Sequence, residues 1–285
     1  MKRELVAVVL AGGEGKRFWP LTTDKNLFPF FGKTFFEQAV VLALPKEISR
    51  IVVVANELNA PVFEAFKFSV PHEVVIQKSA QGMADAMLSA SPRLQGVSLL
   101  VVIADDLTES STLESVVDKA QSSDVFGVLP GWKSKTYFPG GYLVLDGDKV
   151  KSIMEKPGKG NEPSSYVYIS GQYFRESDLL LRALKEISSD RDDVYELALT
   201  TLMKKETFVM ATYQGRFASL KYPWHILDVM NLMFAQLKSY RGTNVVVRDN
   251  VVIEGPVWLE DNVKIFENTK IVGPCYIGKN TVIGN

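Results

Sequence analysis

Three glycines within four positions follow the first apolar run of the chain. They are Gly12, Gly13 and Gly15, and the basic residues Lys16 and Arg17 come directly after them. Glycines allow backbone N–H groups to turn inward around a bound anion, and the basic side chains add charge where phosphates would lie. The segment predicts a polyphosphate-binding loop, although a tight turn could need the same glycines for structural reasons alone.

Two common nucleotide loops do not match this segment. A P-loop requires Ser or Thr after Gly-Lys, but Arg17 follows Lys16, so the hydroxyl that binds the metal is missing. A dinucleotide fingerprint requires a third glycine three residues after the second, and that position holds Phe18. The residues therefore favour neither a P-loop kinase nor a dehydrogenase.

Asp105 is a second residue that could take part in phosphate chemistry. It follows the apolar run Leu99–Ile103, at the expected end of a strand. A carboxylate in such a place can bind Mg²⁺, which bridges phosphate oxygens and neutralises their charge. A lone aspartate at the end of a strand more often caps the helix that follows, so the position by itself does not assign Asp105 to a metal.

Alternating strands and helices must position these residues. Strands are predicted at 5–10, 51–55, 98–103 and 124–129, and helices at 35–44, 59–68, 80–89 and 113–120. This alternation is typical of α/β proteins, in which ligands bind at the carboxyl ends of the strands. We predict a Rossmann-like mixed, mainly parallel sheet sandwiched by helices.

From about residue 137 the pattern changes to that of a hairpin. Strands are predicted at 142–145, 150–154 and 166–174, and helices at 177–187, 194–204 and about 226–239. We interpret this part as a substrate lobe beside the nucleotide lobe, with the last helix closing a first domain at 1–240.

The tail from Asn244 is an internal repeat of six residues. The fourth position of each hexad is aliphatic: Val247, Ile253, Leu259, Ile265, Ile271, Ile277 and Ile283. The second position is small or β-branched: Val245, Val251, Val257, Val263, Thr269, Cys275 and Thr281. These are inward positions of a left-handed parallel β-helix with three hexads per coil, so we predict a second domain at 244–285. Its last coil carries no polar cap, which favours either a truncated domain or a homo-oligomer.

The composition excludes several classes of partner. With 32 Lys and Arg against 33 Asp and Glu, no overall field attracts nucleic acid or an anionic membrane. Cys275 is the single cysteine, which fits a reducing compartment. The apolar run Leu5–Leu10 is too short for a signal sequence or a membrane span, so we expect a cytoplasmic protein.

The run Ala11–Thr22, followed by Lys25–Lys33, resembles the signature of the sugar-1-phosphate nucleotidyltransferases. Members of this family join a nucleoside triphosphate to a sugar 1-phosphate and release pyrophosphate. Later landmarks appear in order: Gln77 and Gly82, Asp105, Gly140-Gly141-Tyr142, Glu155-Lys156-Pro157, and Ser170-Gly171-Gln172-Tyr173. The resemblance covers essentially the whole chain.

The resemblance implies a role for each matched residue. Nucleotide binding falls to Ala11, Gly12, Gly13, Gly15, Gln77 and Gly82, with Gln77 reading the base. Sugar phosphate binding falls to Gly141, Glu155, Lys156 and Gly171. The catalytic residues would be Arg17 on the β and γ phosphates, Lys25 on the transferring region, and Asp105 as the Mg²⁺ ligand.

Three positions depart from the family pattern. Ala104 stands where glycine usually precedes the metal aspartate, Asp24 replaces a frequent proline, and Ser219 aligns with a second metal aspartate of many relatives. A hydroxyl is a poor substitute for a carboxylate on Mg²⁺. The departures leave open a non-catalytic regulatory paralogue that binds nucleotide sugars.

The substrates follow less directly from the residues. Gln77 suggests a pyrimidine base, hence UTP or dTTP with glucose 1-phosphate, because a side-chain amide pairs with the edge of such a base. The segments 17–21 and 25–28 also resemble mannose-1-phosphate guanylyltransferases. A hexapeptide-repeat acyltransferase is disfavoured, since the repeat contains no histidine and two coils form no full acceptor groove.

Overall fold

The computed structural model describes residues 3–109 and 111–284, and the chain divides into two compact units. The first unit comprises Met1–Lys16 and Ala39–Phe217, and the second comprises Arg17–Gln38 and Ala218–Asn285. The segment with the predicted catalytic lysine therefore shares a compact unit with the C-terminal repeat, although more than 200 residues of sequence separate them.

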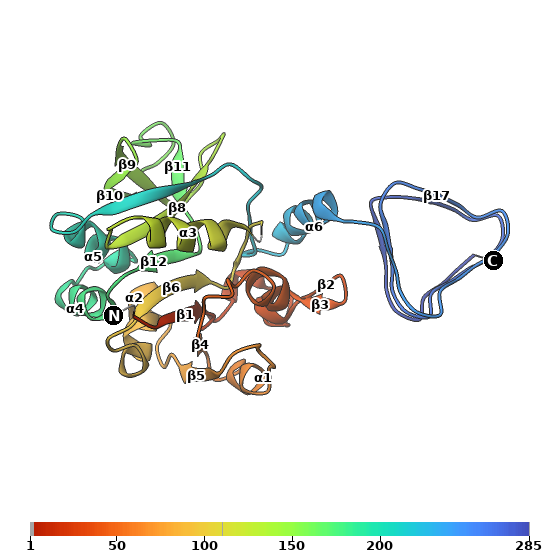
Figure 1. Cartoon of the computed structure of the whole chain (residues 1–285), viewed down its shortest axis with the longest axis horizontal. Helices are drawn as coiled ribbons and strands as arrows, with labels where there is room; N and C mark the ends of the chain where they lie inside the picture. Colours follow the sequence, from red (N-terminus) through yellow and green to blue (C-terminus); the bar gives the residue numbers. More distant parts are fainter. Residues whose placement is uncertain (1–2, 110, 285) are drawn as a thin grey trace. The chain divides into compact units, whose positions relative to one another are not determined.

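A ten-stranded sheet forms the centre of the first unit (Figure 1). Its strands are β1 (Leu5–Leu10), β4 (Arg50–Ala55), β5 (His72–Ile76), β6 (Ser98–Ile103), β8 (Gly127–Lys133), β9 (Gly141–Asp146), β10 (Lys149–Glu155), β11 (Tyr166–Tyr168), β12 (Gln172–Phe174) and β13 (Phe208–Tyr213). The strand order is β11-β9-β10-β13-β8-β12-β6-β1-β4-β5. The strands β5, β4, β1 and β6 pair in parallel, whereas β12, β9, β10 and β11 add antiparallel pairs. The predicted mixed α/β fold is confirmed.

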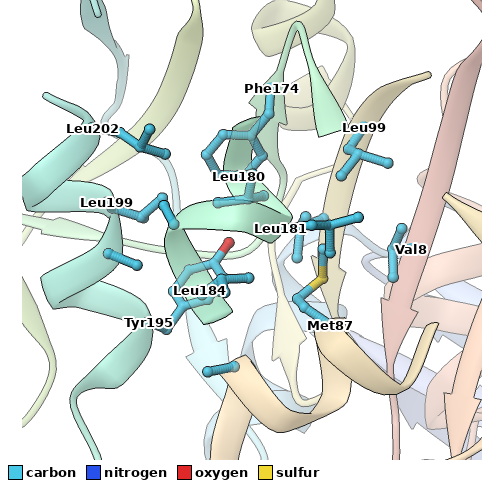
Figure 2. Close-up of a cluster of buried hydrophobic side chains, with 14 of the residues drawn as sticks. Val8, Met87, Leu99, Phe174, Leu180, Leu181, Leu184, Tyr195, Leu199 and Leu202 are labelled. Atoms are coloured by element: carbon cyan, nitrogen blue, oxygen red, sulfur yellow. The ribbon is translucent and has the colours of Figure 1, made fainter. Parts of the chain in front are cut away.

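Helices cover the sheet on both faces because the buried strands are apolar on both sides. On one face, α2 (Gly82–Ala90), α4 (Ser177–Glu186) and α5 (Val194–Leu202) enclose the cluster of buried side chains in Figure 2. Val6 and Val8 of β1 belong to this cluster and the intervening Ala7 does not, since successive side chains alternate between faces. The helix α3 (Ser111–Ser122) packs on β8, β12 and β13 with residues outside the cluster.

The helices expected at 35–44 and 59–68 are shorter in the structure, a π-helix at Glu37–Val41 and α1 at Ala60–Glu64, and the strands β5 and β13 were not predicted. Two predicted strands also differ. The strand expected at 124–129 begins at Gly127, and the strand expected at 166–174 is broken into β11 and β12. Gly171 causes the break with a backbone φ of +99°, and its N–H donates to the carbonyl of Val101 instead of continuing the strand. Among the described residues, no helix has both the length and the apolar character needed to cross a bilayer.

The C-terminal repeat forms a three-sided parallel coil (Figure 1). Its strands are β15 (Tyr240–Arg241), β16 (Val246–Val247), β17 (Val252–Glu254), β18 (Val257–Leu259), β19 (Lys264–Ile265), β20 (Lys270–Val272), β21 (Cys275–Ile277) and β22 (Val282–Ile283). Strands that lie 18 residues apart in the sequence pair in parallel, for example Val257 with Cys275. Leu259, Ile265, Ile271 and Ile277 are buried in the coil, which confirms the inward positions of the hexads.

Asparagines form two of the three corners of the coil. Asn244, Asn250, Asn262, Asn268 and Asn280 all have a positive φ, between 55° and 62°. Asparagine tolerates this left-handed conformation better than other residues with a Cβ atom. The side chains also stack between coils, because Asn244 donates to Asn262 at 3.3 Å and Asn262 donates to Asn280 at 3.0 Å.

Replacing Asn262 by alanine should destabilise the protein by about 2 kcal/mol. Alanine is strained in the left-handed conformation, and it cannot form the two side-chain hydrogen bonds to Asn244 and Asn280. Asn262→Gly is the matched control, because glycine adopts the same φ without strain. Guanidinium unfolding of both variants measures the effect. Equal unfolding midpoints for the alanine and glycine variants would contradict the backbone explanation.

Candidate functional site

The glycine-rich loop leaves β1 at the carboxyl edge of the parallel strands. Asn59 donates to the carbonyl of Ala11 at 3.0 Å, and Asn56 donates to the carbonyl of Gly13 at 3.3 Å. In a trans peptide the C=O and the next N–H point in opposite directions. The two asparagines therefore turn the N–H groups of Gly12 and Glu14 away from themselves, as an anion-binding loop requires.

Gln77 lies directly against this loop. It is buried at the end of β5, and its amide nitrogen donates to Asp85 at 2.6 Å and to the carbonyl of Gly82 at 3.2 Å. A Cβ atom on Gly12 would overlap the Gln77 side-chain oxygen, so only glycine allows this close approach. The structure thus brings three of the predicted nucleotide residues together.

The predicted sugar-side residues lie at the end of β10. Glu155 is the cross-strand partner of Gly141, and the Lys156 ammonium contacts the Glu155 carboxylate at 2.9 Å. Lys156 has a φ of +44°, and its N–H donates to the carbonyl of Gly140 at 3.1 Å. The hydrogen bond to Glu155 raises the pKa of Lys156, so its ammonium stays charged at neutral pH.

Asp192 is close to residues of both predicted sites in the first unit, the nucleotide site and the sugar phosphate site. Its carboxylate approaches Gly82 so closely that a Cβ atom there would overlap it. The same carboxylate contributes to the raised pKa of Lys156. No motif in the sequence distinguishes Asp192, because the acidic run in which it lies is typical of an ordinary solvated loop.

Glu196 was also missed, although it is the most unusual carboxyl group of the unit. It lies on α5 with 7% of its surface exposed, and Tyr168 donates a short hydrogen bond to it. Burial raises the pKa of Glu196 to about 7. The feature of the sequence that could have indicated a buried carboxyl group is the glutamate inside the mainly apolar stretch Val194–Leu202.

Asp105 lies in the turn after β6 and is half-buried. Ser170, in the turn before β12, forms hydrogen bonds with residues on both sides of Asp105 in the sequence. The Ser170 hydroxyl accepts from the N–H of Ile103 at 2.7 Å, and the N–H of Ser170 donates to Asp106 at 3.3 Å. The predicted sugar residue Gly171 follows directly, where a Cβ atom would overlap Leu113. The N–H of Gly171 donates to Val101 of β6, so the structure places Gly171 beside the strand that ends two residues before Asp105.

The donor groups limit how a metal could bind. The described residues contain no group of three or more His, Cys, Asp or Glu side chains that could hold a metal ion. Mg²⁺ is commonly held by one or two carboxylates, with phosphates and water completing its shell. A half-buried Asp105 fits such a substrate-completed site. The Ser219 hydroxyl is buried without a hydrogen-bond partner among the described residues, but a neutral oxygen adds no charge.

The second unit carries Arg17 and Lys25. Lys25 is 7% exposed and begins a short helical turn, Lys25–Leu27, which Asp24 caps by accepting from the N–H of Asn26 at 2.8 Å. The aspartate that departs from the family pattern therefore has a structural role. Arg17 is exposed, and its guanidinium lies 5.6 Å from the ring centroid of Tyr222. Their roles in catalysis stay predictions from the sequence.

The coil contacts the lysine-bearing segment within this unit. Phe31 and Gly32 form the tip of a hairpin between β2 (Pro29–Phe30) and β3 (Lys33–Thr34). Phe31 stacks on Tyr276 of β21 with ring centroids 5.0 Å apart. It also packs on Phe234 of α6 (His225–Gln236) at 4.8 Å. The repeat thus supports the hairpin that follows Lys25.

The chain is similar in sequence to known proteins. A model of the family described as nucleotidyl transferase matches residues 6–218. A bifunctional sugar-1-phosphate nucleotidylyltransferase/acetyltransferase of Sulfurisphaera tokodaii is 30% identical over 93% of the chain, and the chain spans 64% of that relative's length. The bifunctional protein GlmU of Methanococcus vannielii is 24% identical over 97% of the chain and is covered over 69% of its own length.

Solved structures show the same fold. A UDP-glucose pyrophosphorylase in complex with UDP-glucose superimposes with a TM-score of 0.72 at 18% identity, over 82% of this chain and 99% of that one. The UTP-bound enzyme of the same kind from Acinetobacter baumannii gives a TM-score of 0.68 at 16% identity, over 82% and 94%.

Proposed function

Because the chain belongs to the nucleotidyl transferase family, we propose that it transfers a nucleotidyl group from a nucleoside triphosphate to a sugar 1-phosphate, with release of pyrophosphate. One observation carries the proposal. Gln77 contacts both Gly12 and Gly82. Asp192 approaches Gly82, and its charge acts on Lys156. Residues suited to a nucleotide and residues suited to a sugar phosphate are therefore neighbours in the first unit.

The proposed reaction needs positioning and charge more than a protein nucleophile. A phosphate oxygen of the sugar 1-phosphate attacks the α-phosphorus in line with the departing pyrophosphate, and no base is required because the sugar phosphate is already an anion. Lys156 holds that anion, the loop after β1 binds the triphosphate, and Arg17 and Lys25 stabilise the charge that develops in the transition state.

Members of the family use a divalent metal, and we propose Mg²⁺ for this chain. Asp105 would hold it together with triphosphate oxygens, and the ion would supply positive charge beside the α and β phosphates. The end of β6, two residues before Asp105, is held in place because the Ser170 hydroxyl accepts from the N–H of Ile103.

The base-reading group favours some nucleotides over others. The amide nitrogen of Gln77 is occupied by Asp85 and Gly82, which leaves its oxygen, an acceptor, facing Gly12. Uracil, thymine and guanine offer a ring N–H to such an acceptor, whereas adenine and cytosine offer only an exocyclic amine. We therefore propose UTP or dTTP with glucose 1-phosphate, and GTP with mannose 1-phosphate as the alternative.

A pyrophosphate-release assay with a panel of triphosphates and sugar 1-phosphates tests the proposal. We expect turnover with Mg²⁺ and at least one of these pairs, with UTP or dTTP and glucose 1-phosphate the fastest. Absence of pyrophosphate with every pair would overturn the activity. Binding of a nucleotide sugar without turnover would instead favour a regulatory paralogue, which the neutral Ser219 permits.

Gln77→Ala should raise the KM for the preferred triphosphate about tenfold, because one hydrogen bond to the base is worth roughly 1–1.5 kcal/mol. The KM for the sugar phosphate should change little. The exposed Ser79→Ala variant, two residues away and also next to Asp85, is the control. An unchanged triphosphate KM in Gln77→Ala would remove Gln77 from base recognition.

Three further proposals concern the whole protein. We propose 1–240 and 244–285 as functional domains, a homo-oligomeric assembly, and a cytoplasmic location suited to the unpaired Cys275. Apolar positions of the first coil support the assembly: Val252 and Ile253 are 47% and 42% exposed, and Val246 is 38% exposed. A single monomeric species in sedimentation at micromolar concentration would contradict it.

A further inference from the structure

A connected set of residues, joined by side-chain contacts and one backbone strand pairing, runs from the buried Glu196 to the predicted sugar-side residues. Tyr168 donates to Glu196, and the ring of Tyr168 occupies the space where a Cβ atom of Gly141 would lie. Gly141 in turn pairs across the sheet with Glu155, whose carboxylate binds Lys156. Every link is a direct contact within the first unit, so a change at Glu196 reaches Glu155 through two residues.

We propose that Glu196 is a positioning residue that sets how tightly this site holds a sugar 1-phosphate, acting through Tyr168, Glu155 and Lys156. The inference rests on the proposed function and deepens it. Glu196 is buried and accepts from the Tyr168 hydroxyl, and α5 fixes its place because Tyr195 donates to the buried Gln172 at 2.7 Å. Thr200 of the same helix accepts from the N–H of Ile153 on β10 at 3.1 Å.

The charges around Glu196 explain why its protonation matters. The ionisable groups that act on it are Glu155 on β10, Asp192 before α5 and Tyr168 on β11, and Glu196 itself acts on Lys156 and Tyr195. Burial and the two carboxylates raise the pKa of Glu196 to about 7, whereas the hydrogen bond from Tyr168 lowers it. Tyr168 keeps its proton, since burial raises its pKa well above the ordinary value.

The sign of the pH effect follows from these neighbours. Below about pH 7, Glu196 is neutral, and Lys156 faces the carboxylates of Glu155 and Asp192. Above that pH a third negative charge appears beside the same ammonium. An added like charge disfavours binding of a dianionic phosphate. Affinity for the sugar phosphate should therefore fall as pH rises through about 7.

The same charges define the substrate class. Glu155 and Asp192 accept hydrogen bonds from hydroxyl or amide groups, and a sugar that carries its own carboxylate would meet a site that is already acidic. We therefore expect the site to take 1-phosphates of neutral hexoses and to discriminate against those of uronic acids.

Titration calorimetry of glucose 1-phosphate binding from pH 6 to pH 8.5 tests the proposal without requiring turnover. In the wild-type protein the dissociation constant should rise about fivefold across pH 7, and binding near pH 7 should take up protons, because coupling between two binding events is reciprocal. In Glu196→Gln, the part of both effects that belongs to this carboxyl should disappear. The ionisation of the ligand itself remains in both proteins and serves as the internal reference.

Tyr168→Phe provides a second variant with a different expected result. It removes the hydrogen bond that lowers the pKa of Glu196, so the midpoint of the pH dependence should move to higher pH rather than vanish. A merely structural residue would not move a midpoint. The inference is overturned if Glu196→Gln keeps the wild-type pH dependence, or if glucuronic acid 1-phosphate binds as well as glucose 1-phosphate.

Different results would overturn the proposed function and the role of Glu196. Wild-type protein that binds no sugar 1-phosphate at any pH would overturn the proposed function and this inference together. Wild-type protein that releases pyrophosphate but shows the same pH profile as Glu196→Gln would leave the function intact and remove Glu196 from it.

Discussion

Lys25→Ala should lower kcat by about 10²–10³-fold, because one preorganised charge on a developing negative centre is worth that much in catalysis. The KM for the triphosphate should change less, since the loop after β1 and Gln77 would still bind the nucleotide. Single-turnover measurement of pyrophosphate release separates the chemical step from product release.

Lys33→Ala is the matched control for this experiment. Lys33 lies on the same segment, but its side chain is exposed and it belongs to the β2–β3 hairpin. We expect near wild-type turnover. Circular dichroism must show a folded Lys25→Ala protein, because Lys25 is buried and its aliphatic part contributes to packing. A folded Lys25→Ala variant with unchanged kcat would exclude the assigned role.

Asp105→Asn should remove at least about 10³-fold of the metal-dependent activity, since the amide keeps the shape of the carboxylate but loses the charge that holds a divalent cation. The remaining activity should need a higher Mg²⁺ concentration. A Mg²⁺ titration of initial rates at fixed triphosphate measures both effects.

An exposed aspartate on α3, changed in the variant Asp118→Asn, controls for the loss of one negative charge. Its Mg²⁺ titration should match that of the wild-type protein. A full rate with an unshifted Mg²⁺ requirement in Asp105→Asn would show that another carboxylate binds the metal. The buried Asp106 would then be the next residue to test, although its bond to Ser170 gives it a structural role.

Several elements could be predicted because their signal is local. The strands at 5–10 and 98–103 are continuous apolar runs, and the structure has both with these bounds. The hexad pattern predicted the coil correctly, since one inward residue recurs in every side of the triangle. By contrast, β5 and β13 were missed, and β5 is only partly buried, so its residues do not form a continuous apolar run.

The family signature lies in one continuous stretch of chain, which is why residues 11–33 suffice to suggest a nucleotide site. The residues that hold the glycine-rich loop in place are distant from it in the sequence. Asn56 and Asn59 orient the glycine-rich loop from more than 40 residues away. Nothing about an asparagine after a strand distinguishes such a role from an ordinary turn.

The sequence by itself determined the apolar central strands, the inward face of the repeat and the glycine-rich loop after β1, because periodicity and glycine content act over a few neighbouring residues. Only the tertiary structure decided that Glu196 is buried against Tyr168, that Asp192 reaches Gly82, and that Phe31 stacks on Tyr276. The burial and the electrostatic environment of a side chain depend on groups that are distant in the sequence. Folding brings these groups together, so the neighbouring residues in the sequence do not reveal that environment.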